Sequence, residues 1–283
     1  MATIEELKTI ATQVRRDIVR QVTGAKSGHP GGSMSSADIL TALYFNVMKQ
    51  DPEHWTRDAK GQDAFILSAG HISPLMYSVL ARRGYFPVSE LATFRQFGSK
   101  LQGHPSVEHG LKGVFQATGS LGQGLSAAAG IALGKKLDGE NDTFSYVLCG
   151  DGESEEGQIW EAGIFAVYNK LDNLIAMTDW NGQQIDGPVT SVSGQGDLAA
   201  KWRAFDWNVI EADGHDMAAI LDALARAKAN RGTGKPTMIM FRTDMGHGVD
   251  FMAGTHKWHG KAPSQEQCDE ALAQLGTTPL GDY

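Results

Sequence analysis

The sequence predicts an α/β protein in which helices cover both faces of a mostly parallel sheet, a three-layer α/β/α arrangement. Three observations carry this prediction. Five short runs are apolar on both faces of the strands they would form, long helical patterns separate several of them, and every run ends in a polar, Gly-rich turn. The expected strands are 64–67, 146–149, 174–178, 207–211 and 237–241.

The helical segments follow from apolar residues that recur at steps of three and four positions. The N-terminal segment is amphipathic, with Leu7, Val14 and Ile18 on one face. The last helix should begin after Ser264, because Ser264 and Gln267 form an S-x-x-Q capping signal. The expected helices are 3–22, 37–48, 121–137, 158–168, 216–229 and 265–275.

Composition excludes several classes of protein. The 283 residues include 33 acidic and 25 basic side chains, for a net charge of −8, so the basic footprint of a nucleic-acid binder is missing. No apolar run approaches the ~18–20 residues that span a bilayer, so no membrane association is expected. The two cysteines, Cys149 and Cys268, give no disulfide framework, and the N-terminus shows no secretory signal. We therefore expect a cytoplasmic protein.

The polar turns should converge on one site. In parallel sheets covered by helices, ligands bind outside the carboxyl ends of the strands. Each expected strand ends at this edge. The glycine content is also high: 34 of the 283 residues are Gly, about 12% against roughly 7% in an average protein. The segments that follow the strands are 68–71, 150–152, 179–181, 213–216 and 242–247.

The sharpest motif is Gly150-Asp151-Gly152, followed by Asn181 after the next strand. The spacing, 181 − 151 = 30 residues, fits one strand–helix–strand crossover. A carboxylate, an amide oxygen and backbone carbonyls are ligands that suit Mg²⁺, and Gly152 lets a diphosphate approach the backbone. By itself, G-D-G is also a common strand-ending turn. Neither a P-loop nor a G-x-G-x-x-G fingerprint is present, which disfavours ordinary ATP and NAD sites.

These motifs, in this order, resemble those of the N-terminal, diphosphate-binding half of transketolase, a family that uses thiamine diphosphate. The resemblance runs from about Glu5 to Leu275 and implies a thiamine-diphosphate-binding fold. It departs from the family at Trp180 and Gln183, and at Ser120, where many relatives carry Pro. The motifs that carry it are Ser27-Gly-His-Pro30, Ser68-Ala-Gly-His71, Gly103-His-Pro105, Thr118-Gly-Ser-Leu-Gly-Gln-Gly124, Gly150-Asp-Gly152 with Asn181, Asp213-Gly-His-Asp216 and Ala253-Gly-Thr-His256.

The resemblance implies a role for each matching residue. The metal, Mg²⁺ (or Ca²⁺ or Mn²⁺), would be held by Asp151, Asn181 and the backbone carbonyl of Gln183. The diphosphate would contact Gly152, His71 and His256, with Asn181 beside it. The aminopyrimidine would meet Gly119, Ser120 and Leu121, and the donor sugar would face His29, His104 and His256. Glu156 would link the two active sites of a dimer by hydrogen bonding.

Simpler interpretations compete with some of these roles. A His beside a Gly is often a turn residue, and we expect that structural role for His109 and His215. The spacing of His256 and His259 is H-x-x-H, but without a third ligand it indicates a loop rather than a metal site. The acidic cluster of Glu153, Glu155 and Glu156 would ordinarily supply favourable charge for the first turn of a helix, and only Glu156 has a second role from the resemblance.

The resemblance also implies what the chain lacks. In this family, the Glu that activates the cofactor belongs to a pyrimidine-binding module, and nothing after His256 is long enough to encode one. We therefore expect residues 1–283 to form a single diphosphate-binding domain, the N-terminal subunit of a split transketolase acting on a sugar or sugar phosphate. A separate C-terminal subunit would complete an α₂β₂ assembly. The alternatives are the α subunit of a 2-oxo-acid dehydrogenase and a non-catalytic binding module of the same fold.

Overall fold

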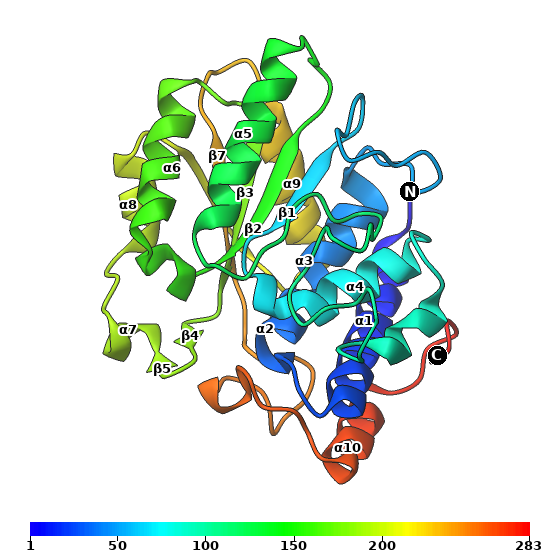
Figure 1. Cartoon of the computed structure of the whole chain (residues 1–283). Coiled ribbons are helices and arrows are strands. Elements are labelled where there is room, and N and C mark those ends of the chain that lie inside the picture. Colours follow the sequence, from blue (N-terminus) through cyan, green and yellow to red (C-terminus); the bar gives the residue numbers. More distant parts are fainter.

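A five-stranded sheet with strand order β1-β2-β3-β7-β6 organises the computed structural model, which describes residues 1–283 (Figure 1). All four neighbouring pairs in this sheet are parallel. Each strand predicted from the sequence is present, with ends that differ by at most two residues, so the predicted α/β class is confirmed. The strands are β1 (Ala64–Leu67), β2 (Ser145–Gly150), β3 (Leu174–Trp180), β6 (Asn208–Asp213) and β7 (Thr237–Arg242).

Helices cover both faces of this sheet. One face packs against α5, α6 and α8, and the other against α1, α3, α4 and α9 (Figure 1). A two-stranded antiparallel ribbon of β4 (Gln183–Gln184) and β5 (Gly187–Pro188) lies outside the sheet. The helices are α1 (Ile4–Ala25), α2 (Pro30–Ser35), α3 (Ala37–Ala42), α4 (Ser73–Arg82), α5 (Gln123–Leu137), α6 (Gly157–Tyr168), α7 (Val189–Val192), α8 (Leu198–Ala204), α9 (Met217–Ala229) and α10 (Gln265–Leu275).

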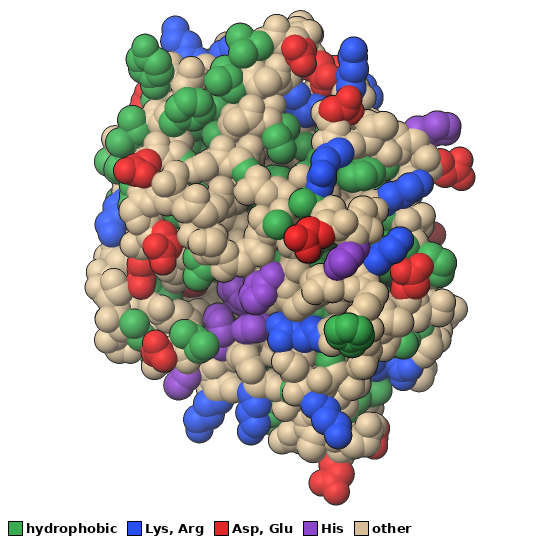
Figure 2. Space-filling view, in the orientation of Figure 1, with side chains coloured by type: hydrophobic (Ala, Val, Ile, Leu, Met, Phe, Trp, Pro, Cys, Tyr) green, Lys and Arg blue, Asp and Glu red, His purple; other side chains and the backbone are tan.

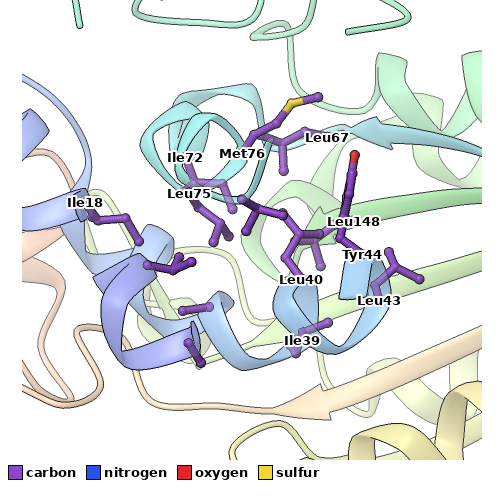
Figure 3. Packing of buried hydrophobic residues seen from close by; sticks show 14 of the residues in the cluster. Ile18, Ile39, Leu40, Leu43, Tyr44, Leu67, Ile72, Leu75, Met76 and Leu148 are labelled. Carbon is purple, nitrogen blue, oxygen red and sulfur yellow. The ribbon is translucent and has the colours of Figure 1, made fainter. Parts of the chain in front are cut away.

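The apolar core forms two clusters because successive strand residues point to opposite faces of the sheet. The larger cluster of 48 buried residues includes Leu67 and Leu148, and the smaller cluster of 19 includes Ile66 and Val147. Figure 3 shows the larger cluster, in which Leu40 of α3 lies among side chains from the neighbouring helix α4 and the strands. The sheet is therefore sealed on both sides, and its polar chemistry is confined to the strand ends.

Two helix boundaries show how local sequence acts. Ser264 caps α10 with the expected capping box, accepting from the backbone N–H of Gln267. The helix expected over 37–48 ends at Ala42 and continues as a π-helical turn over Leu43–Val47. No helix combines the length and apolar character needed to cross a membrane.

Parallel topology places the carboxyl ends of β1, β2, β3 and β7 along one edge of the sheet. Two of the helices that follow these strands begin there, α4 after β1 and α6 after β2. The backbone amides at the start of a helix favour anions, so this edge combines side-chain oxygens with a place for negative charge.

Candidate functional site

A cavity of about 300 Å³ opens at the carboxyl edge of the sheet. It is lined by residues from seven separate segments of the chain, which is typical of a ligand site built at strand ends. Figure 2 shows His side chains gathered in a hollow of this face, next to a basic side chain. The predicted site residues that line the cavity are His29, His71, Gly119, Leu121, Asp151, Gly152, Glu156, Asn181 and Gln183.

Asp151 and Asn181 supply the oxygen atoms on one wall of the cavity. The Asp151 carboxylate accepts from the backbone N–H groups of Gly152 at 2.8 Å and Gly182 at 2.6 Å. The Asn181 Oδ1 atom accepts from the backbone N–H of Gln183 at 2.9 Å. These contacts hold the turn after β3 against the turn after β2, so the two side chains are fixed relative to each other.

A second carboxylate, Asp179, is buried and also lines the cavity. It accepts from the Ser35 hydroxyl at 2.5 Å and from the Asn181 amide at 2.9 Å, as well as from the Thr243 hydroxyl. The bond from the Asn181 nitrogen orients that amide and leaves its oxygen on the other side. Sequence reasoning missed this role, because Asp179 simply reads as the last polar residue of a strand.

The electrostatics of this wall fit a divalent cation. Burial, together with the nearby Asp179 carboxylate, raises the pKa of the Asp151 carboxyl to about 7. Neither carboxylate forms an ion pair with a Lys or Arg side chain. A divalent metal would neutralise this charge, and oxygen donors of this kind are its usual protein ligands.

Four histidines gather at the cavity: His29, His71 and His259 line it, and His104 lies next to His29. Ring centroids lie 5.1 Å apart for His29 and His71, 4.9 Å for His71 and His259, and 6.4 Å for His29 and His104. Burial, together with the neighbouring His259 and Arg95, lowers the pKa of His29 to about 4. Burial also lowers the pKa of the other three. At neutral pH these imidazoles are uncharged, so each can donate one hydrogen bond and accept another.

Two polar atoms at this site have no partner within the chain. The Nδ1 atoms of the cavity-lining His29 and His259 are buried without a hydrogen bond. A buried polar atom without a partner costs free energy, and a ligand that bonds to these atoms would recover it. The cavity therefore has the properties of a binding site for a polar molecule.

Comparison with known proteins identifies the family. The model of the family described as "Transketolase, thiamine diphosphate binding domain" matches residues 7–283. The chain belongs to the transketolase family.

Its relatives fall into two size classes. The chain is 41% identical to a 6-deoxy-6-sulfo-D-fructose transketolase subunit of Clostridium sp. (strain MSTE9), over 95% of this chain and 96% of the relative. It is 39% identical to one of the apulose-4-phosphate transketolase subunits of Actinobacillus succinogenes, over 96% of each protein. Human transketolase is 36% identical over 96% of this chain, which corresponds to only 42% of that enzyme.

The fold agrees with solved transketolases. The structure of transketolase from Leishmania mexicana superposes with a TM-score of 0.90 and 35% identity, over 100% of this chain and 42% of that one. The chain is therefore the N-terminal, thiamine-diphosphate-binding part of a split transketolase, and its relatives are consistent with ketol transfer. The match to transketolases favours this family over the 2-oxo-acid dehydrogenase alternative.

Within this transketolase site, the predicted residues His104 and Ser120 lie outside the cavity lining. His104 lies behind the cavity, against Gly119, where an added Cβ would be 2.9 Å from the His104 ring. The side chain of Ser120 is exposed to solvent and does not line the cavity. Gly119 has a φ of +138°, which directs this segment between His104 and the cavity.

His256 does not line the cavity either, whereas His259, three residues later, does. Thr255 caps a short 3₁₀ turn over His256–Trp258, and Trp258 packs into the core. The chain then turns so that His259 lines the cavity beside His29, with ring centroids 5.6 Å apart. The H-x-x-H pair lies in a turn, and its second His faces the site. Tertiary packing, and not the spacing of the pair, decides which of the two rings points inward.

His215, expected to be structural, is satisfied within the protein. Its Nδ1 atom lies 3.1 Å from the Asp38 carboxylate, and its Nε2 accepts from the backbone N–H of Asp244 at 2.9 Å. Its ring also stacks on that of His247, at 3.5 Å between centroids. Both ring nitrogens are occupied, in keeping with the expected role.

Proposed function

We propose that this chain binds thiamine diphosphate and Mg²⁺ in the cavity and, with a C-terminal subunit, transfers a two-carbon ketol unit from a ketose to an aldose. The observation that carries the proposal is one cavity that is lined both by oxygen donors suited to a metal and by uncharged histidines. Thiamine diphosphate supplies the carbon–carbon chemistry when bound. The residues of this chain bind and orient the cofactor and hold the sugar.

The oxygen wall is suited to hold the metal and the diphosphate. Asp151, Asn181 and the backbone carbonyl of Gln183 would be the metal ligands, and the same set accommodates Mg²⁺, Ca²⁺ or Mn²⁺. Gly152 has no side chain between its backbone and the diphosphate, and His71 lines the same cavity. Gly119 and Leu121 would contact the aminopyrimidine, with Ser120 supporting that segment from outside.

The histidines are suited to the sugar. His29 and His259 have unbonded Nδ1 atoms, so they can bind sugar hydroxyls or hold a proton near the reacting carbon. His104 lies farther back, and Arg95 bridges the two loops that carry His29 and His104. Its guanidinium donates to the Ser27 hydroxyl at 2.7 Å. We assign no role in the site to His256.

The donor and acceptor are a ketose and an aldose, with pentose phosphates as the first substrates to test. The relatives described above are named for sugars that carry a phosphate or a sulfonate. An anionic group at the far end of the substrate would meet the positive charge of Arg95 at this side of the site. We therefore include both phosphorylated and sulfonated ketoses among the donors to test.

We propose that residues 1–283 are one diphosphate-binding domain that assembles as α₂β₂. The outer face of α5 and α6 supports association, because Leu137, Ile164 and Tyr168 are exposed by 78%, 60% and 84%. Gly130 on the same face has no atom within 4 Å of an added Cβ, so another surface could approach closely. Glu156 lies at the start of α6, where it could link two sites across such an interface.

A cytoplasmic location agrees with two free, buried cysteines, Cys149 and Cys268. The cytoplasmic location is part of the proposal. A fold without a disulfide bond does not need an oxidising compartment. Disulfide formation plays no part in the assembly that we propose.

The test is a reconstitution with the purified chain, a candidate C-terminal transketolase subunit, Mg²⁺ and thiamine diphosphate. Ketol transfer is expected with both subunits and none with the chain alone. Full activity of the chain alone would overturn the two-subunit proposal. Absence of Mg²⁺-dependent thiamine-diphosphate binding by the wild-type assembly, or binding that Asp151→Ala leaves unchanged, would favour a non-catalytic module.

A further inference from the structure

We propose that Glu153 is a positioning residue that ties the segment facing the aminopyrimidine to the turn that holds the metal. This inference rests on the proposed function, because it assigns cofactor ends to two walls of the cavity. Glu153 lies in the 3₁₀ turn Gly152–Glu155, two residues after Asp151, and is only 3% exposed. If Glu153 only supplied charge to the start of a helix, its side chain would lie in water. In the structure it is buried.

The carboxylate of Glu153 collects three donors from three separate segments. Its Oε2 atom accepts from the backbone N–H of Gly150 at 2.9 Å. Its Oε1 atom accepts from the backbone N–H of Gly122 at 2.8 Å and from the hydroxyl of Ser68. Hydrogen bonds to an ionised acceptor are roughly twice as strong as neutral ones, so this is a substantial clamp.

Each of the two backbone donors adjoins a residue that the proposed function places at the cofactor. Gly150 precedes Asp151 at the metal wall, and Gly122 directly follows Leu121. Gly122 is the residue before α5 and has a φ of +84°. As a glycine it has no side chain that could cap this helix. The Glu153 carboxylate thus takes the place of a helix cap, and it does so from the metal-binding turn.

Close backbone contacts make this junction sensitive to small movements. A Cβ at Gly124 would lie 2.5 Å from the Cα of Ser68, and one at Gly70 would lie 2.7 Å from the backbone of Gly119. The segment 118–124 therefore fits directly against the segment 68–71, and Glu153 bonds to both sides of that contact. Loss of the clamp should displace the aminopyrimidine wall relative to the metal wall.

A carboxamide cannot reproduce these contacts. All three partners are donors, and Gln at position 153 would present an NH₂ group to at least one backbone N–H. If the amide oxygen still accepts from the N–H of Gly150, the NH₂ group faces the N–H of Gly122, and two donors form no hydrogen bond. The exchange Glu153→Gln therefore keeps shape and volume while it breaks the bond between the two walls.

The experiment compares two ligands on the same assembly. Titration calorimetry with Mg²⁺ would measure the Kd of thiamine diphosphate, which touches both walls, and of inorganic diphosphate, which touches only the metal wall. For E153Q we expect thiamine-diphosphate affinity to fall at least about tenfold more than diphosphate affinity. Glu266→Gln, the same exchange at an exposed position on α10, should change neither affinity.

The outcomes separate this inference from the proposed function. Wild-type protein that fails to bind thiamine diphosphate would refute the proposed function. A wild type that binds, with E153Q affinities unchanged or lowered equally for both ligands, would refute the clamp. If E153Q does not fold, Glu153→Asp replaces it, because the shorter carboxylate cannot reach Gly122 and Gly150 together. The same selective loss supports the clamp, and an equal or absent loss overturns it.

Discussion

Replacement of Gly124 by Ala tests whether the start of α5 is held against β1 as closely as the structure indicates. Gly124 is buried, and an added Cβ would lie 2.5 Å from the Cα, Cβ and Oγ atoms of Ser68. Carbon atoms normally meet at about 3.5–4.0 Å, so α5 or the end of β1 must move by about 1 Å. Neither can rotate away, because one of the clashing atoms belongs to the backbone.

The magnitude is set by two opposing contributions. Overpacking a buried contact costs about 1–3 kcal/mol, and the backbone clash places this case near the upper end. The better helix propensity of Ala returns about 1 kcal/mol, which leaves a net loss of about 2 kcal/mol. For a domain of this size each kcal/mol shifts Tm by about 2–4 °C, so the expected decrease is about 4–8 °C.

The assay is thermal and urea unfolding of the purified chain, with Gly130→Ala as the matched control. Gly130 lies in the same helix, is exposed, and has no atom within 4 Å of an added Cβ. Ala at position 130 should raise the free energy of unfolding by up to about 1 kcal/mol. Changes of the same sign and size at both positions would show that helix propensity, not close packing against Ser68, governs this helix.

Four further predictions test the site and the fold. Thiamine diphosphate with Mg²⁺ at about 100 times Kd should stabilise the wild type by about 2.7 kcal/mol in thermal melts and leave Asp151→Asn unchanged; stabilisation of both would contradict the metal assignment. Because the pKa of Asp151 is raised to about 7 in the folded chain, metal-free wild type should lose stability as pH rises from about 4 to about 7, whereas D151N should lose less. Asp282 pairs with Arg16 at 2.7 Å and its pKa is lowered to about 2, so its stabilisation is present above about pH 4 and is lost as pH falls through 2. Asp282→Asn should therefore cost about 1 kcal/mol in urea unfolding at pH 7 and close to nothing at pH 2, and an equal cost at both would argue against the ion pair. His259→Ala should lower kcat/KM of the reconstituted enzyme at least about tenfold and His256→Ala less than about twofold; the reverse order would restore His256 to the site.

The strands and the longer helices could be predicted because their patterns are local. Strands buried on both faces are short apolar runs, and amphipathic helices repeat every three to four residues, so both are visible without tertiary information. The helix α4 (Ser73–Arg82) escaped prediction because Ser73–Ala81 is buried throughout and shows no polar face. α8 (Leu198–Ala204), at seven residues, was too short to show a repeat.

The sequence by itself determined the fold class, the edge of the sheet that carries the polar strand ends, and the position of Asp151 and Asn181 together at that edge. All three depend on strand order along the chain and on the residues that end each strand, which topology brings to one edge. Only the tertiary structure decided between His256 and His259, because a buried Trp258 and a short turn choose which ring faces inward. It also decided that Glu153 is buried rather than solvated, because its three partners come from positions 68, 122 and 150, on three different segments. Contacts of that kind leave no periodic signal, since they depend on how folded segments pack and not on the spacing of residues within any one of them.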